Sequence, residues 1–535
     1  MVKKNVVLLC TVFFICLGNV SAYGTVQDIS DKQISFVGKI NVNDLPKYEK
    51  TPHGFIKLFL PKDAISFHLD KNKADFLHTT KNVLSFPVQK HVAEPIVLTT
   101  PKIVAGFDGL NQTQCDCVPP DVQIAVGPNH VVEMVNADMG IWDKSGTLLS
   151  TILLDKLFTV PSSDILSDPR VMFDVSSKRW YSSILDVTTS HVGIAVSTSD
   201  DPTKSWNVYN IQFDNNCPDQ PSIGLSVDKF VVSANDFSNC LSNPVFVGSQ
   251  YFVIDKNDLA LGVQNPAMQK FGPDGSTFSM FPVQSLDSDS TLFMVNAYGN
   301  DNILHLYSLT GSVPNIQVTK TDFVIQTINM PPSAAQSNST ISVDTGDDRI
   351  QSAVENDGTL WLGLTDGCTP PGDTLARSCV RLIELDTAKP IVLQDFDIAS
   401  NGFYYFYPAL TVDSSSRLNL IFGYSSQSDY PGLMFAVQDS GVGTNSVTSP
   451  QIFQQGFWYD STGRYGDYFG SSIDTSRPSY AWFAGEYHKA KASSWSTFVA
   501  TTNPDAIPEF PYSVAILGIS MFSLIVLYRL QVRFR

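Results

Sequence analysis

The middle of the chain alternates short apolar runs with polar turns, and this pattern returns about every 50–60 residues. Each copy has a corner of Pro, Asp, Gly or Tyr, a short apolar strand, a polar turn, and a second strand rich in β-branched and aromatic residues. Seven copies begin at Pro119, Asp168, Pro221, Asp289, Asp347, Tyr407 and Gly466. A fixed period that carries strands and no helices is typical of a β-propeller. The pattern predicts an all-β fold with a single propeller of seven blades over residues 101–501.

The first and last strands of such a ring must pair, because two open strand edges would otherwise remain. Residues 101–107 precede the first copy, and strands are predicted at residues 480–487 and 497–499 in the last one. We expect the segment 101–107 to join these strands and close the ring.

The N-terminal 100 residues differ from the propeller region. Lys3 and Lys4, an apolar run and the small-residue ending at Ala22 predict a secretory signal peptide over residues 1–22. An uncleaved anchor is the alternative. Residues 23–100 contain scattered strand-like runs at 34–40, 54–60 and 64–69. We expect them to form a small β leader or stalk, with a removable propeptide as the alternative.

The C-terminus predicts a membrane anchor. After a linker over residues 502–511, the apolar residues 512–528 form a predicted transmembrane helix, whose length of about 25 Å is at the lower end of a membrane span. Residues 529–535 contain three arginines and are expected to stay in the cytoplasm. The propeller would then lie outside the cell.

The tripeptide Pro508, Glu509 and Phe510 stands just before this apolar stretch. The tail resembles the C-terminal sorting signals of archaeal surface proteins, in which such a tripeptide precedes the span and a basic cluster ends the chain. The resemblance covers the last 28 residues and implies attachment at the cell surface, through the span or through a lipid. An ordinary anchor is the alternative.

The charge and the cysteines restrict the partners and the compartment. The formal net charge of −17 argues against nucleic acid as a partner, since phosphate binding needs a basic face. Six cysteines follow the signal segment, and an even count in an exported chain indicates disulfides. The spacing favours Cys217–Cys240 and Cys368–Cys379. The state of Cys115 and Cys117 stays open, with a zinc site including His130 as a weak alternative. Asn111 and Asn338 are predicted glycosylation acceptors.

Ser199, Asp201 and Trp206 have the spacing of an Asp box, although Thr203 stands where Gly is usual. In sialidase-like propellers this box is a turn on the perimeter, so it bears on the fold alone. With the corner motifs, it makes residues 107–501 resemble secreted bacterial and archaeal propellers of mostly unknown function. That group implies no catalytic set. Arg170, Arg349, Arg381 and Arg464 could supply the cations of a sialidase, but the Phe/Tyr-Arg-Ile-Pro motif is absent.

The residues that open each copy are the candidate ligand-binding residues. If they occupy equivalent positions on the inner strands, they converge around one mouth of the central channel, nearer the axis than Trp206. A ring of Asp with some Arg and Tyr can hold a cation or a hydroxyl-rich ligand. The alternative is that these acids only satisfy backbone N–H groups in turns. The set contains Asp121, Asp168, Arg170, Asp289, Asp348, Arg349, Tyr407, Asp467 and Tyr468.

Calcium is the one cofactor that the sequence suggests. Asp255, Asn257 and Asp258 form one weak candidate site, and Asp344 and Asp347 form another. Neither matches an EF-hand loop, and no nucleophile elbow, zinc-protease motif or phosphate-binding loop occurs in the chain.

These observations predict a cell-surface propeller that binds an extracellular glycan, a protein or a cation. A hydrolase acting at the channel mouth and a structural envelope component are the alternatives.

Overall fold

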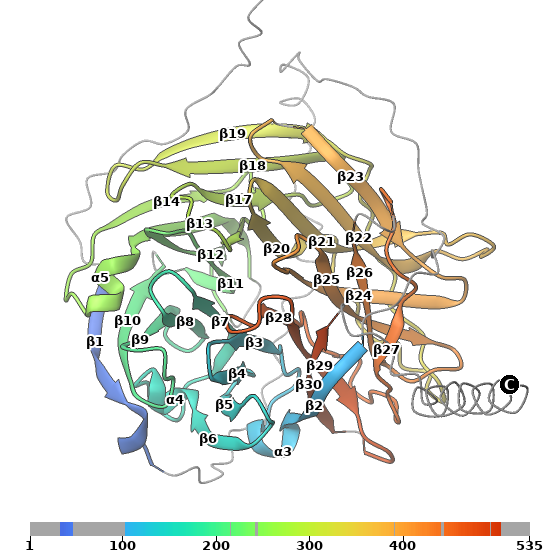
Figure 1. The fold of residues 1–535 in the computed structure, drawn as a ribbon, viewed down its shortest axis with the longest axis horizontal. Coiled ribbons are helices and arrows are strands. Elements are labelled where there is room, and N and C mark those ends of the chain that lie inside the picture. Colours follow the sequence, from blue (N-terminus) through green and yellow to red (C-terminus); the bar gives the residue numbers. More distant parts are fainter. Residues whose placement is uncertain are drawn as a thin grey trace, which may run out of the picture.

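The computed structural model describes residues 33–46, 102–213, 216–240, 244–389, 391–439, 443–492 and 494–503. Their sheets are arranged radially around a central axis, so the predicted all-β propeller is confirmed (Figure 1). The described helical segments are short: η1 (Val42–Asp44), α3 (Gln112–Cys115), α4 (Leu154–Leu157) and α5 (Lys256–Leu261). Among the described residues, no helix has the length and apolar character to cross a membrane. The predicted signal peptide and the predicted span at 512–528 lie outside these ranges.

Five sheets are discrete blades. The first contains β3 (Gln123–Val126), β4 (His130–Met134), β5 (Asp138–Asp143) and β6 (Leu148–Leu153). The second contains β7 (Leu166–Asp174), β8 (Arg179–Asp186), β9 (His191–Ser197) and β10 (Ser205–Gln212), with β1 (Ile34–Asn41) on its outer edge. The third contains β15 (Phe281–Pro282), β17 (Leu292–Asn296), β18 (Ile303–Thr310) and β19 (Gln317–Val324). The fourth contains β24 (Phe403–Val412), β25 (Leu418–Ser426), β26 (Gly432–Gln438) and β27 (Gln451–Gln454). The last contains β28 (Gly470–Ile473), β29 (Ala481–His488), β30 (Trp495–Asn503) and β2 (Lys102–Asn111).

The sixth sheet has nine strands and corrects the expectation of seven separate blades. One half contains β11 (Cys217–Leu225), β12 (Lys229–Phe237), β13 (Phe246–Asp255) and β14 (Met268–Asp274). The other half contains β20 (Ile350–Asn356), β21 (Thr359–Cys368), β22 (Arg377–Asp386) and β23 (Ile391–Ile398). β16 (Gln284–Ser285) joins them, because it pairs in parallel with both β11 and β20. The structure therefore has five discrete blades and one double sheet, and the sequence period could not show this fusion.

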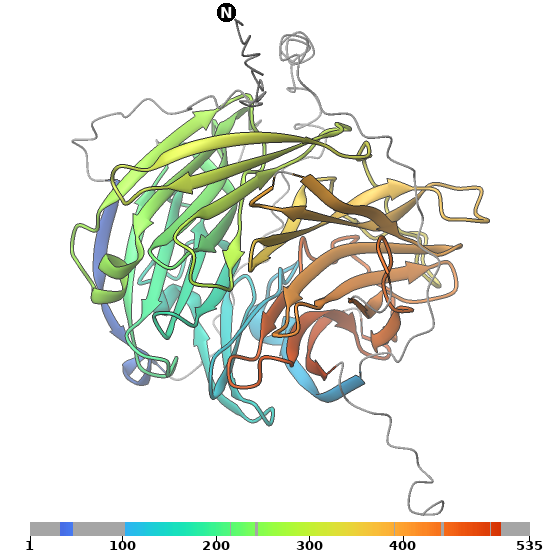
Figure 2. The same cartoon turned by 45° about the horizontal axis from the view of Figure 1, so that its top comes forward.

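The ring is closed as predicted. β2 pairs antiparallel with β30, with Phe107 opposite Val499, so the start of the propeller completes its last blade. The two strands lie side by side in both views (Figures 1 and 2).

β1 lies in the segment that the sequence analysis assigned to a leader. It pairs antiparallel with β10 from Ile34 opposite Ile211 to Asn41 opposite Ser205, and thus extends the second blade. The strand-like runs expected at 54–60 and 64–69 lie outside the described residues.

The blades bury apolar residues on both faces, because each blade packs between two neighbours. Trp180 and Trp206, for example, lie fully buried in a cluster that joins the first and second blades. Trp206 is on β10, away from the inner strand β7, and its indole N–H donates to the Pro202 carbonyl at 2.9 Å in the Asp-box turn. This agrees with the predicted perimeter position of that box.

A residue with positive φ stands at or just before each inner strand. At three of these corners a proline follows the residue, as in Asp168–Pro169, Gln220–Pro221 and Tyr407–Pro408. The register of β7, β11 and β24 shifts at these points, so the corner turns the backbone at the inner end of its sheet. The full set is Asp121, Asp168, Gln220, Ser279, Gly346, Tyr407 and Gly466.

Candidate functional site

The corners surround a central cavity of about 380 Å³. Five of the seven positive-φ residues line it, so residues far apart in sequence converge there. This volume is within the usual range for small-molecule sites, about 300–1,000 Å³. The converging corners are Asp121, Asp168, Gln220, Ser279 and Gly346.

Three carboxylates from three blades meet in this cavity. One oxygen from each of Asp121, Asp168 and Asp467 lies within 4.8 Å of the others. Asp121 and Asp168 are buried, and Asp467 is half-buried. We call these three residues the Asp triad.

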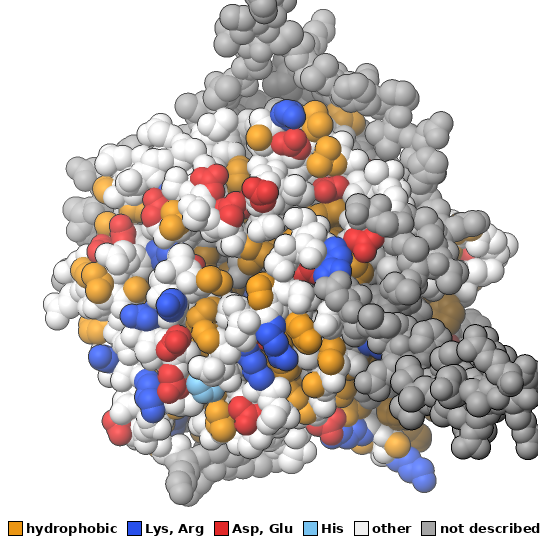
Figure 3. Space-filling view, viewed as in Figure 1, with side chains coloured by type: hydrophobic (Ala, Val, Ile, Leu, Met, Phe, Trp, Pro, Cys, Tyr) orange, Lys and Arg blue, Asp and Glu red, His pale blue; other side chains and the backbone are white. Residues whose placement is uncertain are grey.

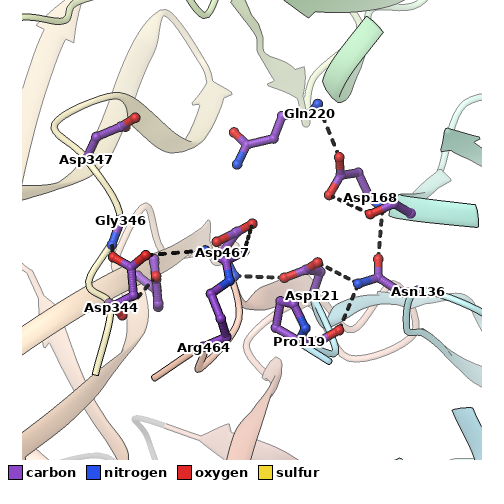
Figure 4. Close-up of polar contacts among 12 residues, drawn as sticks. Pro119, Asp121, Asn136, Asp168, Gln220, Asp344, Gly346, Asp347, Arg464 and Asp467 are labelled. Carbon is purple, nitrogen blue, oxygen red and sulfur yellow. Dashed lines mark hydrogen bonds and ion pairs between the residues drawn. The ribbon is translucent and has the colours of Figure 1, made fainter. Parts of the chain in front are cut away.

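A continuous chain of polar contacts holds the Asp triad in place (Figure 4). Asn136 donates to Asp121 Oδ2 at 2.6 Å and accepts from the Asp168 N–H at 2.8 Å. The Asp467 N–H donates to Asp121 Oδ1 at 2.8 Å, and the Gln220 N–H donates to Asp168 Oδ2 at 3.2 Å. The triad thus satisfies two backbone N–H groups, as the turn alternative expects, yet the carboxylates also face one common cavity.

The charge of the cavity is unbalanced toward acid. Its lining includes nine aspartates and three arginines. Burial, together with the Asp467 and Asp168 carboxylates, raises the pKa of Asp121 well above its usual value. Burial, together with Asp219 and Asp467, raises the pKa of Asp168 to about 7. The cavity therefore holds carboxylates whose ionised form is unfavourable without a positive partner.

The three arginines are already engaged. Arg349 binds Asp347 through two nitrogens, at 2.7 and 2.6 Å. Arg464 contacts Asp467 at 2.8 Å and Asp344 at 3.3 Å. The Arg170 guanidinium stacks on the Tyr468 ring, 3.6 Å from its centroid, and its Nε donates to the Pro221 carbonyl. Arg349 and Arg464 are thus ion-paired, and Arg170 is the one arginine of the lining whose charge is not paired with a carboxylate in the described part of the chain.

Six of the predicted ligand-binding residues line the cavity together. They are Asp121, Asp168, Arg170, Arg349, Asp467 and Tyr468. Whether they bind a ligand stays a prediction, but the structure brings them to one place.

The other three predicted residues lie elsewhere. Asp289 is exposed in the turn before β17, and its carbonyl accepts from Val227 in the turn that follows β11. β17 runs antiparallel to the inner strand β15, so its start lies at the opposite end of the sheet from the cavity. Asp348 is buried and accepts from the Gly299 and Asn300 N–H groups. Tyr407 is buried, and its hydroxyl donates to the Asp344 carbonyl.

The weak calcium candidates have local structural roles. Asp255 caps α5 by accepting from the Asn257 and Asp258 N–H groups, and Asp258 accepts from the Ala267 N–H. Asp344 and Asp347 line the cavity, where they pair with Arg464 and Arg349.

Several cavity residues were not predicted from the sequence. Asn136 and Asp219 were not selected, and neither was Gln220, although Gln220–Pro221 repeats the corner of Asp168–Pro169. An alignment of the copies on the residue before the proline would have found Gln220. Asn136 follows the second strand of its blade and carries no signal in the repeat.

Three disulfides are present among the described residues. Cys217–Cys240 and Cys368–Cys379 form as predicted, and Cys115 pairs with Cys117. This third bond corrects the zinc alternative, since both thiols are used. His130 lies 4.0 Å from Asp201 instead. Cys115–Cys117 and Cys217–Cys240 both border the cavity.

The two predicted glycosylation acceptors differ in their surroundings. Asn338 is exposed. The Asn111 side chain caps α3 and bonds Gln114 Oε1 at 2.7 Å, so its amide nitrogen is engaged.

Acidic and basic side chains are both scattered over the face seen in Figure 3.

Comparison with known proteins adds no family. No family model matches the chain, and no curated protein sequence matches it. Among solved structures, it is similar to a protein of unknown function from Dyadobacter fermentans, with 6% identity and a TM-score of 0.32, over 75% of this chain and 97% of that one. It is also similar to a Hadza microbial sialidase, with 10% identity and a TM-score of 0.35, over 69% and 73% of the two chains. A Trypanosoma rangeli sialidase has 9% identity and a TM-score of 0.31, over 67% and 56%. At these values the similarities carry no inference about activity.

Proposed function

We propose that the chain is an exported binding protein whose central cavity takes a neutral, hydroxyl-rich ligand, such as the end of an extracellular glycan. One observation carries this proposal: nine aspartates and three arginines from different sheets line one cavity, and two of the arginines are ion-paired to aspartates there. Carboxylates accept hydrogen bonds from hydroxyl groups, while arginines held by their neighbours donate in fixed directions.

The same arrangement disfavours an anionic sugar. A ligand carboxylate would have to displace Asp347 from Arg349, or Asp344 and Asp467 from Arg464. It would also meet the surplus of aspartates in the cavity. The ligand class is therefore neutral or cationic.

We further propose that the protein works outside the cell, anchored by its C-terminal span or by a lipid. The three disulfides support this, because such bonds persist in oxidising environments. The predicted signal peptide and sorting tail agree with it.

A hydrolase is the second candidate, and the Asp triad favours it. Asp168, with its pKa raised to about 7, lies next to the carboxylates of Asp121 and Asp467. A protonated carboxyl beside an ionised one is the usual arrangement for acid–base cleavage of glycosides. A hydrolase would turn over its substrate, whereas a binding protein would not.

A glycan array with the purified full chain tests the proposal. We expect binding to neutral oligosaccharides, and the Asp219→Asn variant should bind at least tenfold more weakly, because this substitution removes a charged acceptor from the cavity. Asp289→Asn is the matched control, since the same change is made in an exposed turn outside the cavity. Equal binding by both variants and the wild type would contradict the proposal. Released product from a bound oligosaccharide would favour the hydrolase.

A further inference from the structure

We infer that Asp121, Asp168 and Asp467 form a Ca²⁺ site that ties the first two blades to the last one. The inference rests on the proposed function, because the site lies in the same cavity and would place a cation beside the ligand.

The geometry of the Asp triad fits one shared ion. Calcium binds oxygens at about 2.3–2.6 Å, so two oxygens on opposite sides of one ion are up to about 5 Å apart. One carboxylate oxygen of each triad member lies within 4.8 Å of the others. All three ligands are carboxylates, which suit a hard cation such as Ca²⁺.

The charges around the Asp triad leave room for a cation. Asp467 shares Arg464 with Asp344. Among the described residues, no lysine or arginine forms an ion pair with Asp121 or Asp168. The Arg464 and Arg170 charges favour the ionised forms of Asp121 and Asp168 only from beyond ion-pair distance, so a bound cation would add to them.

A buried glutamate gives a second, independent indication. Glu486 on β29 is 1% exposed, and its Oε1 atom pairs with His488 Nε2 at 3.1 Å. Its Oε2 atom has no hydrogen-bond partner among the residues that the structure describes. A Cβ atom on Gly466 would lie 3.8 Å from this Oε2 and 4.0 Å from Asp121 Oδ1. The Glu486 Oε2 and Asp121 Oδ1 atoms thus both border the position that Gly466 leaves free, beside Asp467 in the chain. A buried carboxylate oxygen without a partner is unfavourable, and a nearby cation would stabilise it.

The site would act on the fold as well as on the ligand. Asp121 stands before β3, Asp168 is on β7, and Asp467 stands before β28, so one ion would join three blades. An ion that binds only the folded chain raises its thermal stability. Calcium should therefore raise the Tm of the protein in the absence of any glycan.

Calorimetric titration of CaCl₂ into the chelator-treated, dialysed full chain tests this inference. We expect one Ca²⁺ per chain and a Tm that rises by several degrees. Asp168→Asn and Asp467→Asn should each weaken Ca²⁺ binding at least tenfold, and Glu486→Gln should weaken it less. Asp289→Asn, outside the cavity, should bind as the wild type does. If Asp168→Asn fails to fold, the half-buried Asp467→Asn still decides the result.

Two results would overturn the inference: the absence of both heat and a Tm increase with Ca²⁺, or unchanged binding by Asp467→Asn. Because the titration contains no glycan, its outcome is separate from that of the proposed function. Calcium binding without any glycan binding would leave the ion site standing and refute the glycan ligand. Glycan binding that is equal in calcium and in chelator, with no Ca²⁺ bound, would support the glycan ligand and refute the ion site.

Discussion

Asp121 and Asp467 stand 346 positions apart in the chain, and the Asp121 Oδ1 atom accepts a hydrogen bond from the Asp467 N–H at 2.8 Å. This bond joins the corner of the first blade to the corner of the last one. The ring is therefore closed twice, by the β2–β30 pairing in the last sheet and by side chains around the cavity.

The closing strand can be tested at Gly109. A Cβ atom there would clash with Glu133 Oε2 and Thr497 Oγ1, so Gly109→Ala must displace these side chains of the first and last blades. We expect the free energy of unfolding to fall by about 1–3 kcal/mol, measured by urea denaturation. The matched control is Gly38→Ala on β1, where a Cβ would meet nothing within 4 Å. Equal stability of the two variants would argue against this closure.

Asp348 should behave as a structural residue. Its carboxylate accepts from two backbone N–H groups, those of Gly299 and Asn300, and it is buried. Asp348→Ala leaves both donors without a partner, and we expect a loss of about 1–3 kcal/mol in the free energy of unfolding. Asp289→Ala, in an exposed turn, should change stability by about 0.5 kcal/mol or less. Thermal unfolding of both variants compares them, and a stable Asp348→Ala would refute this role.

Glu133 makes stability depend on pH. It is fully buried, and burial raises its pKa from 4.5 to about 7, while Oε2 accepts from the Leu110 N–H. Between pH 4.5 and 7 the unfolded chain releases this proton and the folded chain keeps it, so the free energy of unfolding falls as pH rises and is lowest above pH 7.

Glu133→Gln removes this titration and keeps an acceptor for Leu110. The variant should match the wild type near pH 4 and exceed it by up to about 3 kcal/mol above pH 7. Denaturant titrations at a series of pH values measure the difference. A difference between the two proteins that does not change with pH would contradict the assignment.

The repeat in the sequence predicted the fold because each strand unit has the same corner and the same apolar strands. It placed Asp121, Asp168 and Asp467 at the cavity, since all three stand at or beside a corner of an inner strand. Asp289 was misplaced because the fourth copy was aligned on β17, whereas the inner strand of that sheet is the two-residue β15.

Other features could not be predicted from the sequence. β16 joins two sheets through two residues only, which is too short for a pattern. The pairing of Arg349 with Asp347 was also not predicted, although the two residues are close in sequence. This contact makes Arg349 unavailable to an anion. The contact depends on the direction in which the two side chains point, which the sequence does not show.

The central claim is that ligands bind where the corners meet. Hydrogen exchange of the full chain, with and without an oligosaccharide selected on the array, tests it most directly. The Asp168, Gln220 and Asp467 N–H groups donate to residues around the cavity, so they report on it. We predict that the peptides containing these three amides gain protection together when the oligosaccharide binds. Protection confined to the outer strands β19 and β23, with no change at the corners, would contradict the account.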